Sequence, residues 1–297
     1  MIFFIFLVAN IGGAATPLGD PPLFIGFLKG IDFFWFIRHL YPVLFSTMFG
    51  LCLMFFIIDS ILFRLDKEAL SEVSNDAPSF VLRGKLNLCL IASVSVIVVL
   101  CNFEGSFTIF GETFNYASVL RNLLLITISL ISIKMTAPTI RQKNNFTFLP
   151  IREIAELFAG IFITVTPIIA ILHQGVDGEF RSIFDWIAPA GNFIAARCFW
   201  VSGLLSSILD NAPTFLIFFH LTSGDAETLM TVKSYILRAI SISTVFMGAL
   251  TYIGNAPNLM VKSVSSHYGI KTPSFLGYMA WSFAILLPVF LIISYFL

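Results

Sequence analysis

The chain has 297 residues, of which 58% are hydrophobic and 11% are charged, and its 17 basic residues balance its 17 acidic ones. Water-soluble domains carry roughly a quarter charged residues, so this composition excludes an ordinary soluble protein. It also excludes a disordered chain, which needs low hydrophobicity, and a nucleic-acid-binding protein, which needs a basic excess. The composition therefore predicts an all-α polytopic protein whose main partner is the lipid bilayer.

Long apolar runs divide the chain into segments that can cross or enter a bilayer. A helix needs roughly 20 apolar residues to span the hydrocarbon core. None of the runs alternates polar and apolar residues as barrel strands do, so all of them predict helices. In chain order we expect a broken helix at 1–38, helices at 40–63, 86–101, 117–133 and 153–173, a hairpin at 183–220, a broken helix at 231–266 and a helix at 274–297.

The basic residues predict the orientation of these segments. Lys and Arg cluster in 64–85 and again in 134–152, whereas 102–116 between them holds Glu104 and Glu112 and no basic residue. Loops rich in Lys and Arg stay in the cytoplasm. We therefore expect a multi-pass protein of the cytoplasmic (inner) membrane, with 64–85 as a cytoplasmic linker between the parts 1–63 and 86–297.

The run 183–220 is too long for one span and contains no charged loop that could separate two spans. Its middle contains residues that form tight turns and satisfy their own backbone. These residues are Ser206, Ser207, Asp210, Asn211, Pro213 and Thr214. The pattern predicts a re-entrant hairpin that enters the membrane and returns to the same side.

An internal repeat links the two ends of the chain. The segment 13–22 recurs at 248–257 with the shared pattern G-A-x-T-x-[LI]-G-[DN]-x-P. Glycine permits non-helical dihedral angles and proline removes a hydrogen-bond donor, so both copies predict a broken helix. The helix-breaking residues are Gly13, Gly19, Pro22, Pro213, Gly248, Gly254 and Pro257. The two copies lie on segments of opposite predicted direction, which is typical of inverted-repeat transporters with a central site.

Two carboxylates lie inside otherwise apolar sequence, at Asp20 and Asp210. A charged side chain at the bilayer centre costs about 2.5–3.5 kcal/mol, so such residues are functional by default. The structural alternative is that each caps a half-helix. We expect an ion-binding site at Asp20, Asp210 and Asn255, with further neutral oxygens from Thr16, Ser206, Ser207, Asn211, Thr214, Thr251 and Asn258.

Three segments, NIGGAATPLGDPP, SSILDNAPT and GALTYIGNAPNLM, together resemble the ion transporter superfamily. That superfamily includes NhaD-type sodium/proton antiporters, arsenite-efflux permeases and citrate transporters, and the resemblance is closest to the antiporters. It implies a transporter rather than an enzyme, with sodium ions and protons as the transported species, sodium at Asp20, Asp210 and Asn255, and no other cofactor. It also implies a homodimer, and two hairpins and two broken helices around one site. The first hairpin does not precede Gly13, so we expect the N-terminal part of the first repeat to be missing.

Several alternatives stay open. The chain could be an inactive fragment, or a half-transporter that pairs with a separately encoded N-terminal half. It could instead transport arsenite or a carboxylate within the same superfamily. A further alternative is an intramembrane aspartyl protease, which uses two membrane aspartates. Against the protease, Thr16 and Pro17 stand where its motif needs a glycine, and Asp210 does not follow a tyrosine.

Overall fold

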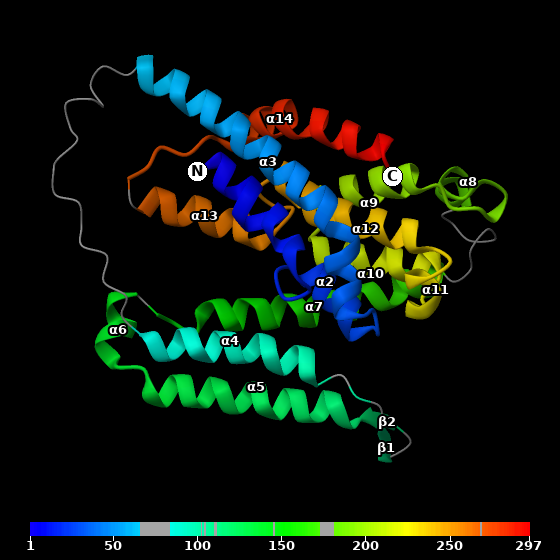
Figure 1. Ribbon diagram of the computed structural model, residues 1–297. Coiled ribbons are helices and arrows are strands. Elements are labelled where there is room, and N and C mark those ends of the chain that lie inside the picture. The colour runs from blue at the N-terminus through cyan, green and yellow to red at the C-terminus, as the bar shows by residue number, and fades with distance from the viewer. Residues whose placement is uncertain are drawn as a thin grey trace. The chain divides into compact units, whose positions relative to one another are not determined.

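The computed structural model describes residues 1–65, 84–101, 103, 105–109, 112–144, 146–172, 181–267 and 269–297 (Figure 1). The chain forms two compact units, one comprising Met1–Ser71 with Leu157–Leu297 and the other Glu72–Glu156. Apart from one short strand pair, the regular structure is helical, so the protein is an all-α polytopic membrane protein. Among the described residues, α3, α5 and α14 are long and apolar enough to cross a membrane.

The first unit opens with a helix that changes pitch and then stops. It runs through α1 (Ile2–Phe4), the π-helix η1 (Ile5–Asn10) and the 3-10 helix η2 (Ile11–Ala15). The backbone is then extended at Thr16 and Asp20 before α2 (Pro21–Leu28) begins. A turn at Gly30, where φ is +100°, leads into α3 (Phe33–Leu65). The apolar runs predict that the second helix begins at residue 40. In the structure α3 begins earlier, at Phe33.

The middle of the first unit is a helical hairpin. The elements are α8 (Arg181–Ile187), the 3-10 turn η4 (Pro189–Gly191), α9 (Ala195–Ile208), α10 (Asn211–Thr222) and α11 (Ala226–Met230). Helices α9 and α10 contact each other across a turn at Leu209 and Asp210. This turn falls within the segment for which the Ser, Asp, Asn and Pro residues predict a hairpin tip.

The last part of the first unit repeats the plan of the first part. Its elements are α12 (Ser234–Met247), the 3-10 turn η5 (Gly248–Leu250), α13 (Ala256–His267) and α14 (Phe275–Tyr295). Helix α12 is buried from Ile236 to Met247 except at Arg238, and it packs against α9 and α10 (Figure 1). Its buried apolar residues belong to the hydrophobic core, together with those of α9, α10 and α14.

The second unit is a pair of antiparallel helices joined by a β-hairpin. Its elements are α4 (Lys85–Leu100), β1 (Ser106–Ile109), β2 (Glu112–Asn115), α5 (Tyr116–Met135) and α6 (Pro138–Lys143), and α7 (Leu149–Leu172) leads back to the first unit. Cross-strand stacking of Phe107 on Phe114 stabilises the hairpin, which the sequence patterns do not predict. Most of the expected linker 64–85 lies outside the described residues.

Candidate functional site

The first helix break is built on a close approach of backbone atoms. A Cβ atom on Gly19 would lie 2.3 Å from the carbonyl oxygen of Gly13, so only glycine fits there. The Gly19 N–H donates to the carbonyl of Thr16, which closes the turn. Asp20 then precedes the first turn of α2, and Pro22 is the second residue of that helix, where its missing N–H costs little. The motif thus places Asp20 at the N-cap position of α2, although its carboxylate makes no capping hydrogen bond to that helix.

The second break has the same construction. A Cβ atom on Gly254 would lie 2.7 Å from the carbonyl oxygen of Gly248. The Thr251 hydroxyl accepts hydrogen bonds from the backbone N–H groups that follow it, including that of Gly254 at 3.0 Å. Asn255 then stands directly before α13, as Asp20 stands before α2, and Pro257 is the second residue of the helix. The sequence repeat is therefore a repeat of structure.

Asp20 is the centre of the site. Its side chain is 4% exposed, and its Oδ2 atom accepts a hydrogen bond of 2.8 Å from Nδ2 of Asn211. Asn255 Nδ2 makes a longer contact of 3.4 Å with Oδ1. The three residues stand at the N-termini of α2, α10 and α13. The two breaks and the hairpin tip therefore meet at one carboxylate.

Asn10 extends this cluster, and the sequence patterns do not single it out. Its Nδ2 atom donates to Oδ1 of Asn258 at 2.7 Å, and its own Oδ1 accepts from Asn255 Nδ2 at 3.1 Å. The residue is fully buried at the end of the π-helix η1. The sequence feature that could have indicated Asn10 is that its amide interrupts an apolar run three residues before Gly13. We call Asn10, Asp20, Asn211, Asn255 and Asn258 the Asp20 cluster.

We expect Asn10→Ala to lower the free energy of unfolding by about 1–3 kcal/mol, because it leaves the buried Oδ1 atom of Asn258 without its hydrogen-bond donor and removes one of the hydrogen bonds of Asn255. Thermal unfolding of the purified protein, followed by tryptophan fluorescence, measures the loss. Asn192→Ala is the matched control, since Asn192 is exposed and a surface change of this kind shifts stability by less than about 0.5 kcal/mol. Equal melting temperatures for the two variants would contradict the prediction.

Asp210 has a different position from Asp20. It is half-buried, and its carboxylate accepts the backbone N–H of Asn211 at 2.7 Å, which caps α10. The Thr214 hydroxyl donates to the Asp210 carbonyl oxygen at 3.0 Å, and Pro213 lies in the first turn. The capping role foreseen as the structural alternative is therefore present. No hydrogen bond joins Asp210 to Asp20 among the described residues.

The hydroxyl groups of the expected site tie the hairpin to the second break. Ser206 Oγ donates to the carbonyl of Thr244 at 2.7 Å, and Thr251 Oγ1 donates to the carbonyl of Ser207 at 2.6 Å. Ser207 Oγ donates within its own helix, to Leu204. The Thr16 side chain is half-buried and makes no hydrogen bond to a described residue. These hydroxyl groups hold the site together rather than converging on Asp20.

The two helix breaks differ in the hydrogen bonds that their freed backbone carbonyl groups accept. In the second break Asn258 Nδ2 donates to the carbonyls of Gly248 and Thr251, both at 2.9 Å. From α14, Tyr278 and Ser282 donate hydroxyl bonds of 2.6 Å to the carbonyls of Ala249 and Leu250. In the first break no described side chain donates to the corresponding carbonyls of residues 13–15. The first break therefore keeps carbonyl oxygens that a ligand could use.

Charge around Asp20 is not balanced by a basic side chain. Within the described residues the ion pairs are Arg152–Glu156 and Arg181–Asp185, and both are solvent-exposed. The hydrogen-bond partners of Asp20 are neutral amides. A buried carboxylate without a counter-charge is strongly unfavourable, so Asp20 needs a proton or a bound cation.

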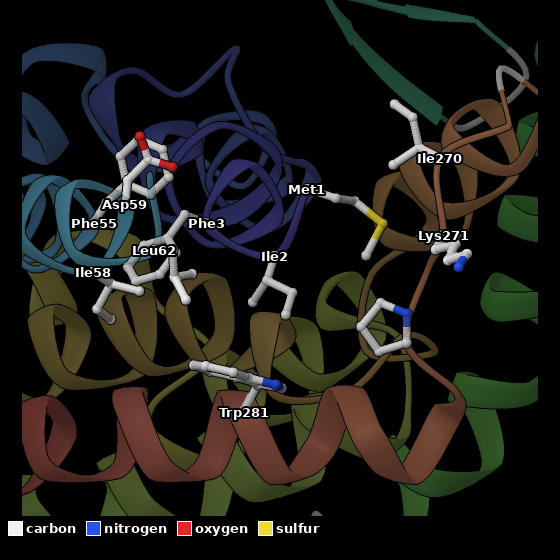
Figure 2. A pocket seen from close by; sticks show the side chains of 11 residues that line it. Met1, Ile2, Phe3, Phe55, Ile58, Asp59, Leu62, Ile270, Lys271 and Trp281 are labelled. Atoms are coloured by element: carbon white, nitrogen blue, oxygen red, sulfur yellow. The ribbon is translucent and has the colours of Figure 1, made fainter. Parts of the chain in front are cut away.

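A cavity of about 290 Å³ lies elsewhere in the first unit (Figure 2). Apolar side chains from the N-terminal residues, α3 and α14 form most of its lining, with Trp281 among them. Figure 2 shows Asp59 and Lys271 on opposite sides of this space, and they form no ion pair. None of its lining residues belongs to the Asp20 cluster, so the cluster is a separate and buried site.

Comparison with known proteins gives a match to a family model but none to an individual protein. No curated protein and no solved structure matches the chain. A family model named CitMHS_2 and described as "Putative citrate transport" matches residues 1–297. Buried helix breaks around an uncompensated carboxylate agree with a membrane transporter. The chain belongs to this citrate-transport family, which is a member of the ion transporter superfamily.

Proposed function

We propose that the protein is a secondary active transporter of the cytoplasmic membrane in which Asp20 binds a sodium ion and a proton in turn, giving sodium/proton antiport. The observation that carries the proposal is a carboxylate that is 4% exposed and has only neutral amides as partners. Such a group is stable when protonated or when it binds a cation, and either state can give way to the other. This exchange is the elementary step of antiport.

The cluster contains oxygen atoms that suit a cation. Asn211 Oδ1 is buried and has no hydrogen-bond partner, which is unfavourable unless a ligand approaches it. Sodium binds carboxylate, amide and unwound backbone carbonyl oxygens in transporters of this construction. Asp20, Asn211 and the free carbonyls of residues 13–15 together offer such a set. The amide donors of Asn211 and Asn255 would stabilise the carboxylate while the cation moves.

The two breaks support alternating access. Hydrogen bonds from Tyr278, Ser282 and Asn258 to backbone carbonyls stabilise the second break, which supports a rigid backbone there. In the first break no described side chain donates to the carbonyls, and the turn is closed by the hydrogen bond from the Gly19 N–H to the Thr16 carbonyl. We propose that the first break changes shape while the second stays rigid. The hairpin of α9 and α10 would then act as a re-entrant element on the rigid side.

A specific observation also favours a carboxylate substrate. Three helix N-termini meet at the Asp20 cluster, and each carries a partial positive charge that attracts anions. The family match is to citrate transport. In this second candidate function, a cation at Asp20 would neutralise the site and a carboxylate substrate would bind against the helix ends, so that both move together.

Reconstituted vesicles separate the two functions. We expect an inward sodium gradient to drive protons out of vesicles that contain the full chain and a trapped pH dye, while a choline gradient does not. Lithium and potassium gradients would define the ion selectivity. Labelled citrate that enters only with sodium, without proton exchange, would favour the second function. Absence of both fluxes from inserted protein would contradict transport by this chain.

A further inference from the structure

The second unit contains a polar cavity of about 170 Å³ that the proposed function does not use. It lies where the N-terminal end of α4 meets the C-terminal end of α5 and the short helix α6. The polar lining comes from Asn87, Ser132, Thr136, Arg141 and Asn144. Such a combination of amide, hydroxyl and guanidinium groups offers hydrogen-bond donors to an oxyanion.

The lining is organised by side-chain hydrogen bonds. Asn87 Nδ2 donates to Thr136 Oγ1 at 2.9 Å, and Ser132 Oγ donates to Asn87 Oδ1 at 3.1 Å. Arg141 Nη2 donates to the carbonyl oxygen of Ser132 at 3.3 Å. The Arg141 side chain makes no other hydrogen bond or ion pair to a described residue. The guanidinium is thus positioned at the cavity with most of its donors free for a ligand.

The surrounding charge is of one sign. Lys85, Lys134 and Lys143 flank the cavity in the sequence, and all three are exposed. The sequence contains no Asp or Glu in 84–103 or in 117–152. The electrostatic potential at this end of the helix pair therefore favours an anion.

The position of the cavity identifies the kind of anion. Helix α5 is a candidate membrane span and ends at Met135, so the cavity residues lie at the membrane–water interface. The basic residues of this end predict the cytoplasmic side. Basic pockets at the cytoplasmic ends of membrane helices bind lipid head groups. We propose that this cavity binds the phosphate of an anionic phospholipid, with Arg141 as the principal contact.

Lipid binding to the full chain tests the proposal directly. The protein, purified in a neutral detergent, would be titrated with phosphatidylglycerol or with phosphatidylcholine, and bound lipid would be counted by native mass spectrometry. We expect phosphatidylglycerol to be preferred and Arg141→Gln to weaken its binding about fivefold, which is the effect of one basic residue at a membrane surface. Arg141→Lys should keep most of the preference, because it keeps the charge.

Arg152→Gln is the matched control, since it removes the same charge from an exposed residue that is paired with Glu156 and does not line the cavity. Equal binding of the two lipids would overturn the proposal, as would equal losses for Arg141→Gln and Arg152→Gln. In a third arm, millimolar inorganic phosphate should not displace the bound lipid. Displacement by free phosphate would overturn the lipid assignment and indicate a site for the soluble anion.

Discussion

Asp20→Asn is expected to reduce sodium-dependent flux to the level of empty vesicles. Asparagine has nearly the shape of aspartate and can still accept a hydrogen bond from Asn211. It can neither release a proton nor carry the negative charge that a cation needs. Because the change removes a buried charge without creating a cavity, the variant should fold and insert as the parent does. The measurement is the same dye assay, corrected for the amount of inserted protein.

Asp225→Asn is the matched control for this experiment. Asp225 is exposed and caps α11 through a hydrogen bond of 2.8 Å from the Thr228 N–H. Hydrogen bonds from the side chain and backbone of Thr228 lower the pKa of Asp225, so the substitution removes a true negative charge. Asparagine caps helices as well as aspartate does. Loss of flux in both variants, or retained flux in Asp20→Asn, would contradict the assigned role of Asp20.

Gly19→Ala is expected to destabilise the protein by at least about 3 kcal/mol, the upper range for overpacking. The added methyl group would lie 2.3 Å from the Gly13 carbonyl oxygen and 3.0 Å from the Gly13 Cα. Both are backbone atoms, so no side-chain rotation can relieve the contact. The turn would open and move Asp20, the next residue, away from Asn211. Thermal unfolding and the yield of monodisperse protein measure the effect.

Gly50→Ala provides the control for the glycine substitution. Gly50 lies on the exposed face of α3, and a Cβ atom there would meet nothing within 4 Å. Alanine is favoured over glycine inside a helix by roughly 0.5–1 kcal/mol, so this variant should be as stable as the parent or more so. A Gly19→Ala variant with parental stability would show that the first break does not depend on the close Gly13–Gly19 approach.

Local sequence rules account for much of the candidate site. The repeated glycine and proline residues predicted both helix breaks, and Asp210 predicted the hairpin tip through its turn and capping chemistry. Each of these effects acts within a few residues, because glycine and proline change the backbone where they stand. Asp20 and Asp210 also stood out, since a carboxylate in an apolar run indicates either a functional site or a helix cap.

The roles of Asn10, Tyr278 and Ser282 could not be predicted in the same way. Each makes its decisive hydrogen bond to a residue from a different part of the chain. Asn10 and Asn258 are separated by 248 positions. Whether a buried amide or hydroxyl serves a site or a scaffold depends on which backbone group lies opposite, and that follows only from helix packing.

The same distinction holds for the whole protein. Its sequence by itself determined a membrane-embedded helical chain with two matching breaks, because hydrophobic composition and backbone stereochemistry are properties of local residues. Only the tertiary structure decided that Asp20 meets Asn211 and Asn255, while Asp210 caps α10 through the Asn211 N–H and makes no hydrogen bond to Asp20 among the described residues. It also decided that carbonyls of the second break accept hydrogen bonds from α14, while those of the first break accept none from a described side chain. A buried polar group must find its partner in three dimensions, and the packing of α10, α12 and α14 sets which partner is within reach.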